Sequence, residues 1–211
     1  MRFNNEEIVF LTSVSRGNVP FGIKYKLPRE GEKEAFVERT IQSLMQKGIL
    51  DGQRKLTKEG AGIIRCWEEY RNCKDHVMIR RIRAALLPGG MLVAVLPDGD
   101  AYEVQYMNAE VLMLAILKQA RSLCGASTQP ERGKWQDMAG EMPGGESGEQ
   151  EGMIPIIKFE YFKAIDRRII YWKGEQVYQI NPERMRIRTL SPVAARKMIY
   201  TMIGGNRHGQ N

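Results

Sequence analysis

The sequence has few of the residues that most enzymes use for catalysis or for metal binding. It contains two histidines and three cysteines in 211 residues, and no serine has a neighbouring base that the sequence can identify. A histidine-based triad or a zinc centre requires several such side chains held close together. We therefore expect a chain that is not an enzyme and has no catalytic residues, no cofactor and no metal site.

Long apolar runs are also missing. The longest, residues 111–117, is far shorter than the roughly 20 residues that a membrane span requires. The first seven residues include Glu6 and Glu7 and lack the apolar block of a secretory signal. An odd number of cysteines (Cys66, Cys73 and Cys124) fits a reducing compartment better than a set of disulfides. The sequence predicts no membrane span and a cytoplasmic location.

The charge is distributed unevenly along the chain. The net charge is +7, although residues 131–152 contain six acids and only two basic residues. Glycines are frequent over 125–152, and the low apolar content predicts a flexible acidic insert. Trp135 and Met138 are exceptions, so a short segment around Trp135 could dock onto the body or onto a partner; the alternative is a linker with an isolated aromatic residue.

One pattern occurs on each side of this insert. Strand-like runs, with tight turns at Asp98-Gly99 and Lys173-Gly174, lead into a helix in both halves. The expected strands are 77–87, 91–96 and 101–107 with a helix over 108–121, then 154–165, 168–172, 176–180 and 184–189 with a helix over 192–203. Two similar halves predict one joint, mainly antiparallel sheet with a pseudo-symmetric surface.

A helical module precedes the first half. A helix capped by Asn4 or Asn5, a proline-bearing loop over 16–31 and a helix over 32–47 are followed by a short hairpin and a helix that starts at Thr57. This order is typical of the wing half of a winged helix. The middle helix of a DNA-binding winged helix is absent, however, and the helix over 32–47 begins with Glu32, Glu34 and Glu38, which repel phosphate.

The strand expected over 184–189 carries the clearest candidate for a binding surface, a row of arginines. Alternation places Arg184, Arg186 and Arg188 on one face. Such a row could grip an acidic protein surface or a nucleic-acid backbone, or it could protect an edge strand from aggregation. With Trp135 and with Arg196 and Lys197 of the following helix, these arginines are the candidate partner-binding residues.

These observations define an α+β fold: a quasi-two-fold body with a central, mainly antiparallel sheet flanked by helices, preceded by a winged-helix-like N-terminal module. The expected parts are the N-terminal module (1–75), the first half (76–124), the flexible insert (125–152) and the second half (153–205), which together form one globular body.

The order of these parts resembles the EspG-like family of chaperones from type VII (ESX) secretion systems, with the related uncharacterised families of Gram-positive type VII gene clusters. The resemblance rests on the proline loop, on RTIQSLMQKGIL followed by KLTKEGAGIIRCW, and on RAALLPGGMLVAVLPDGDAYEVQYM with its similarly built second half. It implies a quasi-two-fold α/β body that binds a helical-hairpin secretion substrate in the cytoplasm and keeps it soluble. This chain is shorter than the better-known members.

Three functions follow as hypotheses. The first is a non-enzymatic chaperone or adaptor that binds a helical client of a type VII secretion system. The second is a winged-helix nucleic-acid-binding protein, such as a transcriptional regulator, which the basic charge favours. The third is a permanent structural component of a multi-protein assembly.

Overall fold

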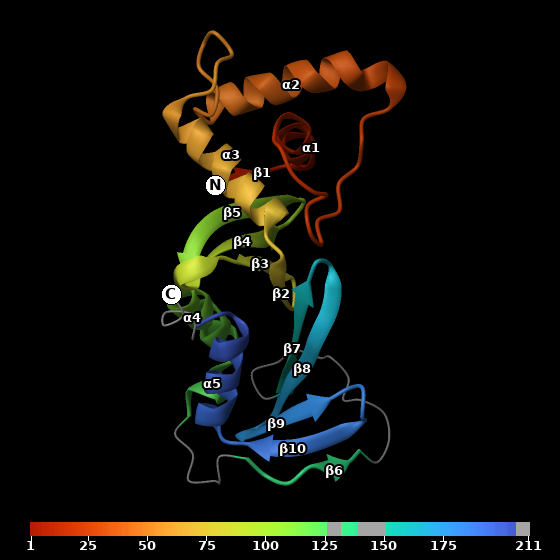
Figure 1. Ribbon diagram of the computed structural model, residues 1–211, viewed down its shortest axis with the longest axis vertical. Coiled ribbons are helices and arrows are strands. Elements are labelled where there is room, and N and C mark those ends of the chain that lie inside the picture. The colour runs from red at the N-terminus through yellow and green to blue at the C-terminus, as the bar shows by residue number, and fades with distance from the viewer. Residues whose placement is uncertain (126–131, 139–150, 206–211) are drawn as a thin grey trace. The chain divides into compact units, whose positions relative to one another are not determined.

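The computed structural model describes residues 1–125, 132–138 and 151–205 (Figure 1). It shows an α+β protein with a large, mostly antiparallel sheet and several helices. The chain divides into two compact units. Unit 1 comprises Met1–Lys74, Ile82–Ala85 and Val93–Tyr106; unit 2 comprises Asp75–Arg81, Leu86–Leu92 and Met107–Asn211.

Unit 1 contains three helices and one part of the sheet, with strand order β1-β5-β4-β3. In chain order its elements are β1 (Arg2–Phe3), α1 (Asn5–Val14), the short 3-10 helix η1 (Glu30–Glu32), α2 (Lys33–Gln46), α3 (Lys58–Asn72) and the main parts of β3 (Ile82–Leu86), β4 (Met91–Asp98) and β5 (Ala101–Asn108). A capping box starts α1, because the Asn4 side chain accepts the Glu7 N–H at 2.9 Å and the Glu7 carboxylate accepts the Asn4 N–H at 2.7 Å.

The core of unit 1 lies between α1, α2 and α3. Leu11 of α1 and Leu44 of α2 are each about 1% exposed, while Trp67 and Tyr70 of α3 are fully buried and stack at 5.8 Å. A turn over 49–56, closed by an antiparallel bridge between Leu50 and Leu56, joins α2 to α3. The Thr57 hydroxyl then caps α3 by accepting the Gly60 N–H at 2.9 Å, which confirms the helix start expected there.

Unit 2 contains the other part of the sheet, with strand order β2-β7-β8-β9-β10-β6, and two helices. Its elements are β2 (Asp75–Ile79), the 3-10 turn η2 (Pro88–Gly90), α4 (Ala109–Gln119), the 3-10 turn η3 (Arg121–Cys124), β6 (Gln136–Asp137), β7 (Glu151–Glu160), β8 (Lys163–Lys173), β9 (Gln176–Asn181), β10 (Arg186–Leu190) and α5 (Pro192–Met202).

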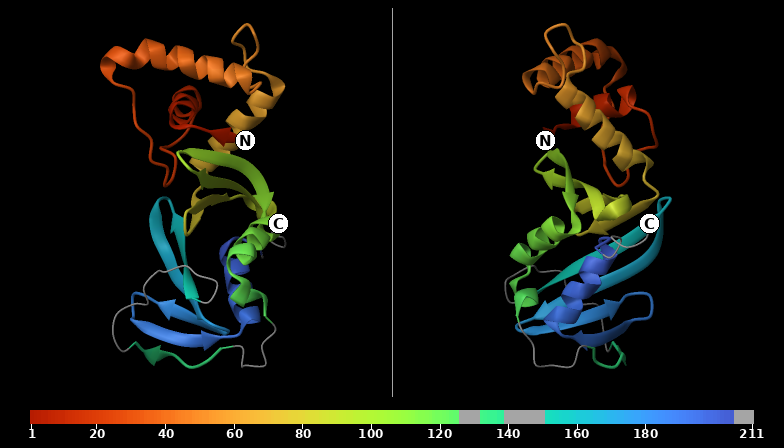
Figure 2. Two further views of the ribbon diagram at one scale, coloured as in Figure 1. Left: turned by 180° about the vertical axis from the view of Figure 1, so that it is seen from behind. Right: turned by 60° about the vertical axis from the view of Figure 1, so that its left-hand side comes forward.

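The core of unit 2 forms where α5 contacts strands β7, β9 and β10, and α4 lies beside α5 (Figures 1 and 2). Ile170 and Trp172 of β8 are at most 1% exposed, as are Ala195 and Ile199 of α5. Ser191 caps α5 by accepting the Ala194 N–H at 3.1 Å, and Pro192 occupies the first turn of the helix expected over 192–203.

Two of the predicted strands are wrong in their extent. The run 77–87 is interrupted at Arg80, whose φ of 52° turns the chain between β2 and β3. The run 154–165 ends at Glu160, because Tyr161 and Phe162, with φ of 44° and 66°, form the turn into β8. Tight hairpin turns need positive φ at their central residues and usually contain glycine or asparagine there. Neither turn carries that sequence signal, which explains both errors.

The expected acidic insert lies partly outside the described residues, over 126–131 and 139–150. Its middle part, residues 132–138, is an extended segment in which β6 pairs with β10, and β7 begins at Glu151. Within the described ranges, every helix is too short or too polar to cross a bilayer.

Candidate functional site

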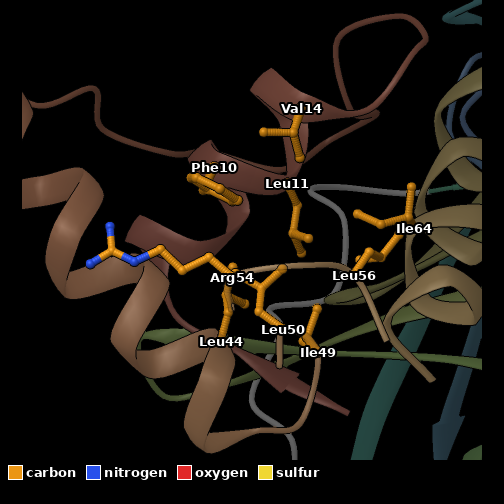
Figure 3. Close-up of a pocket in the computed structure, with 9 residues that line it drawn as sticks. All are labelled: Phe10, Leu11, Val14, Leu44, Ile49, Leu50, Arg54, Leu56 and Ile64. Carbon is orange, nitrogen blue, oxygen red and sulfur yellow. The ribbon is translucent and has the colours of Figure 1, made fainter. Parts of the chain in front are cut away.

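A hollow of about 270 Å³ opens beside α1 in unit 1 (Figure 3). We call it the α1 hollow. Its lining is apolar apart from Arg54 and comes from all three helices and the 49–56 turn: Phe10, Leu11, Val14, Leu44, Ile49, Leu50, Arg54, Leu56 and Ile64. Pockets for small molecules typically measure about 300–1,000 Å³. The α1 hollow is therefore close to the lower limit of that range, a size that a few apolar side chains can fill.

The floor of the α1 hollow is buried and its rim is exposed. Leu11, Leu44 and Ile49 are almost fully buried, whereas Val14 is 56% and Leu56 is 49% exposed. Apolar surface in contact with water is unfavourable by roughly 25 cal/mol per Å². The rim residues therefore provide a driving force for covering the hollow with another apolar surface.

One charged side chain lies at the mouth of the α1 hollow. Arg54 has a φ of 63° in the 49–56 turn, and its guanidinium points away from the apolar residues (Figure 3). It donates to the Glu38 carboxylate of α2 at 2.8 Å. A hydrogen bond from Gln42 is the main cause that lowers the pKa of Glu38, and Arg54 lowers it further. The mouth therefore combines an apolar centre with a polar margin.

The second candidate site lies at the outer edge of β10, where the structure brings together three of the residues singled out in the sequence. The Arg188 guanidinium lies 4.4 Å from the ring centroid of Trp135, and Arg186 Nε lies 2.9 Å from Asp137 Oδ1. Both basic residues come from β10, and both of their partners come from residues 132–138. The segment around Trp135 thus docks onto the body of unit 2, in an extended conformation.

Arg188 is also anchored from the strand on its other side. Its Nε and Nη2 donate to Gln179 Oε1 of β9 at 3.0 and 2.6 Å, and Gln179 is only 5% exposed. Burial lowers the pKa of the Arg188 guanidinium, and the nearby charges of Arg132 and Arg168 lower it further. Arg168 is itself paired with Asp166 at 2.8 Å.

The remaining residues singled out in the sequence lie elsewhere in unit 2. Arg184 precedes β10, in the turn where its N–H donates to Asn181 Oδ1 at 3.1 Å. Arg196 donates to the carbonyl oxygens of Leu123 and Gly125, so that it fastens the end of η3 to α5. Lys197 is exposed on α5. The expected row of three arginines on one strand is therefore reduced to Arg186 and Arg188.

Sequence reasoning did not identify the α1 hollow. Its residues are far apart in the chain, and each one alone has the appearance of a core residue. The available signal was that Phe10 and Val14 are apolar residues of α1 beyond those that a narrow helical stripe requires. In the part of the chain that the structure describes, no three His, Cys, Asp or Glu side chains are grouped so that they could hold a metal ion.

The chain matches a known protein family over residues 1–138, and the family is described as a domain of unknown function, DUF5081. A comparison with curated protein sequences found no match. The family match covers all three helices of unit 1 and ends at Met138, the last residue of the segment docked on β10. Because it spans more than half of the 211 residues, the chain belongs to the DUF5081 family.

Proposed function

We propose that this protein is a non-enzymatic adaptor or chaperone that binds an amphipathic helix of a protein partner at the α1 hollow. The observation that carries the proposal is an apolar hollow with a buried floor and with Val14 and Leu56 exposed at its rim. An amphipathic helix places apolar side chains three or four residues apart into such a groove and leaves its polar face outside. Arg54 then offers its guanidinium to that polar face.

The resemblance to EspG-like chaperones supports a more specific client, a helical secretion substrate of a type VII system held in the cytoplasm. The order of elements adds to this support, because four strands followed by a helix occur twice, as β2 to β5 with α4 and as β7 to β10 with α5. We propose that these two runs are the halves of a quasi-two-fold body. Shielding of an apolar helix before secretion needs no chemistry, only a complementary surface.

The test is co-expression of the full chain with each small, helix-rich protein that the genes neighbouring its own are found to encode. We expect one of them to co-purify at a fixed stoichiometry, and Leu56→Glu to remove it because the glutamate places a charge at the rim of the hollow. Leu27→Glu is the matched control, since Leu27 is 72% exposed in the same unit and does not line the hollow. A Leu56→Glu chain that is folded by circular dichroism and still retains the partner would refute the proposal.

One observation favours nucleic acid as a second candidate partner. The turn between α2 and α3 carries exposed Arg54 and Lys55, and α3 starts at exposed Lys58, as at the wing of a winged helix. The exposed acids Glu32, Glu34 and Glu38 of the preceding segment weigh against it, as does the pairing of Arg54 with Glu38. In a gel-shift titration at low salt, nucleic-acid binding that weakens as salt is added would favour this function over the adaptor.

A further inference from the structure

Residues 132–138, here called the docked segment, form an added strand along β10. Asp137 pairs with Arg186 and Gln136 with Ile187 in antiparallel register. The Met138 N–H donates to the Met185 carbonyl at 2.9 Å, and the Gly133 N–H donates to the Thr189 carbonyl at 3.0 Å. Backbone contacts therefore engage both ends of β10, which resembles the way an extended peptide binds to the edge of a sheet.

The side chains of the docked segment follow a simple spacing. Trp135 contacts Arg188, and Asp137 contacts Arg186. Trp135 and Asp137 are two residues apart in the docked segment, and Arg186 and Arg188 are two residues apart in β10. Because residues two apart on a strand share a face, both contacts lie on the same side of the added strand. The edge of β10 therefore holds an aromatic residue and, two positions later, an acid.

The receiving side of this contact is more firmly held than the docked segment. Arg188 is fixed by the buried Gln179, and Ile187 packs on the core cluster of Ile169, Tyr171 and Ile180. On the docked segment, Gln136 is exposed and the Asp137 side chain is 84% exposed. Exposed ion pairs stabilise a fold only slightly. The edge is thus preorganised for binding, while its present occupant is held mainly by Trp135, by Met138 and by backbone contacts.

We infer that the outer edge of β10 is a binding site for an extended segment of a partner protein that carries an aromatic residue and an acid two positions later. Residues 132–138 are the internal occupant that this segment displaces. A tethered occupant competes at an effective concentration in the millimolar range. The edge is consequently closed to weak ligands and opens to a partner that binds elsewhere on the chain as well. This inference is independent of the α1 hollow, which lies in unit 1.

The test measures binding of a fluorescein-labelled peptide with the sequence of residues 132–138 (RGKWQDM) to the full chain by anisotropy. We expect weak binding to the unsubstituted protein, because its own segment occupies the edge. The Trp135→Ala/Asp137→Ala double variant loses the contacts of Trp135 and Asp137, keeps that of Met138, and is expected to bind the peptide at least about tenfold more tightly. Asp137→Ala alone, which keeps Trp135, should give a smaller gain.

A charge reversal separates recognition from nonspecific adsorption. In the double variant, Arg186→Glu should weaken binding of RGKWQDM about three- to fivefold, and a peptide with lysine in place of the aspartate (RGKWQKM) should restore it. Thermal unfolding checks that each variant is folded. The inference fails if the double variant binds no more tightly than the unsubstituted chain, or if the Arg186→Glu form binds both peptides equally. A dimer of the unsubstituted chain that Trp135→Ala converts to a monomer would identify a second copy as the occupant and also overturn it.

Discussion

Lys47 Nζ lies 2.6 Å from Oε2 of Glu7, whose side chain is completely buried under α1 and α2. Glu7 also accepts hydrogen bonds from the Asn4 N–H and from the Ser43 hydroxyl, each at 2.7 Å, so both of its carboxylate oxygens have partners. Lys47 is different, because 30% of its side chain is exposed. The two partners of this ion pair therefore have unequal access to water.

The two possible disruptions of this pair should have unequal effects. Lys47→Met leaves a buried carboxylate without its counter-charge and should lower the free energy of unfolding by about 3–5 kcal/mol. Glu7→Gln keeps the cap of α1 and lets the amine of Lys47 turn to solvent, so its effect should be about 1–3 kcal/mol. Urea unfolding of both variants measures the difference. Equal effects would show that the pair itself, and not the burial of Glu7, determines stability.

The exposed pair between Arg39 and Glu6 provides the control. Its atoms lie 2.7 Å apart, yet the Arg39 side chain is 58% exposed. Solvent screens such a pair almost completely, so Arg39→Met should leave the urea midpoint unchanged. A large shift for this variant would mean that distance alone governs the contribution of an ion pair in this protein.

Helix starts were the most predictable part of the fold. Of the two asparagines expected to cap the first helix, Asn4 caps α1, and Thr57 caps α3 as expected, because both side chains satisfy free N–H groups locally. Such signals depend only on neighbours in sequence. The turn at Tyr161 and Phe162 could not be predicted, because two bulky residues at positive φ are held by strand pairing and not by their own preference.

The binding surfaces could be predicted only in part. The alternation of Arg186 and Arg188 is visible in the sequence, but Asp137 and Gln179, which engage them, lie in other segments. The composition of 125–152 predicts flexibility. Within this stretch, however, Trp135 lies against Arg188 and Met138 packs on a core cluster of unit 2. Averaged composition cannot show that a few residues match one distant strand.

Gly60 and Gly62 of α3 offer a matched pair of substitutions. A Cβ at position 60 would lie 2.2 Å from the Ile49 carbonyl oxygen, whereas a Cβ at position 62 meets nothing within 4 Å. Gly62→Ala should therefore raise the free energy of unfolding by about 0.5–1 kcal/mol through helix propensity.

Gly60→Ala should lower the stability, because α3 must move away from the 49–56 turn to accommodate the added methyl group. Thermal unfolding of the two variants provides the comparison. If both alanines stabilise the protein, the close approach of α3 to Ile49 is not a constraint on the fold.

Arg71 fastens the first loop to α3. It is 5% exposed, and its guanidinium donates to the carbonyl oxygens of Thr12, Ser15, Gly17 and Asn18 at 2.6–3.1 Å. Desolvation lowers the pKa of this guanidinium, which remains charged. Arg71→Met removes every donor and leaves these carbonyls without their partner.

We expect Arg71→Met to destabilise the protein by about 1–3 kcal/mol in total, because the buried guanidinium is lost while its carbonyl partners are only partly buried and can turn to water. Hydrogen exchange should show faster exchange over residues 12–18 in particular. Arg71→Lys should be intermediate, because one ammonium cannot reach all four carbonyls. Protection of 12–18 that is unchanged in Arg71→Met would contradict this account of the loop.

The three cysteines should differ in reactivity because their burial differs. Cys66 is 2% exposed, Cys73 is intermediate and Cys124 is exposed. Burial raises the pKa of the Cys66 thiol from 9.0 to about 12, and the charge of Glu69 adds to the shift. Because the thiolate is the reactive form, iodoacetamide at pH 8 should modify Cys124 first and leave Cys66 unmodified until the protein unfolds.

The same shift predicts how stability depends on pH. A thiol whose pKa is raised on folding contributes stability that is complete below pH 9.0 and is lost as the pH rises towards 12. Cys66→Ala should therefore reduce the loss of stability between these two pH values, whereas Cys124→Ala should not change it. Urea unfolding of the two variants across this range tests the sign: an alkaline loss that is the same in both would place its origin at another group.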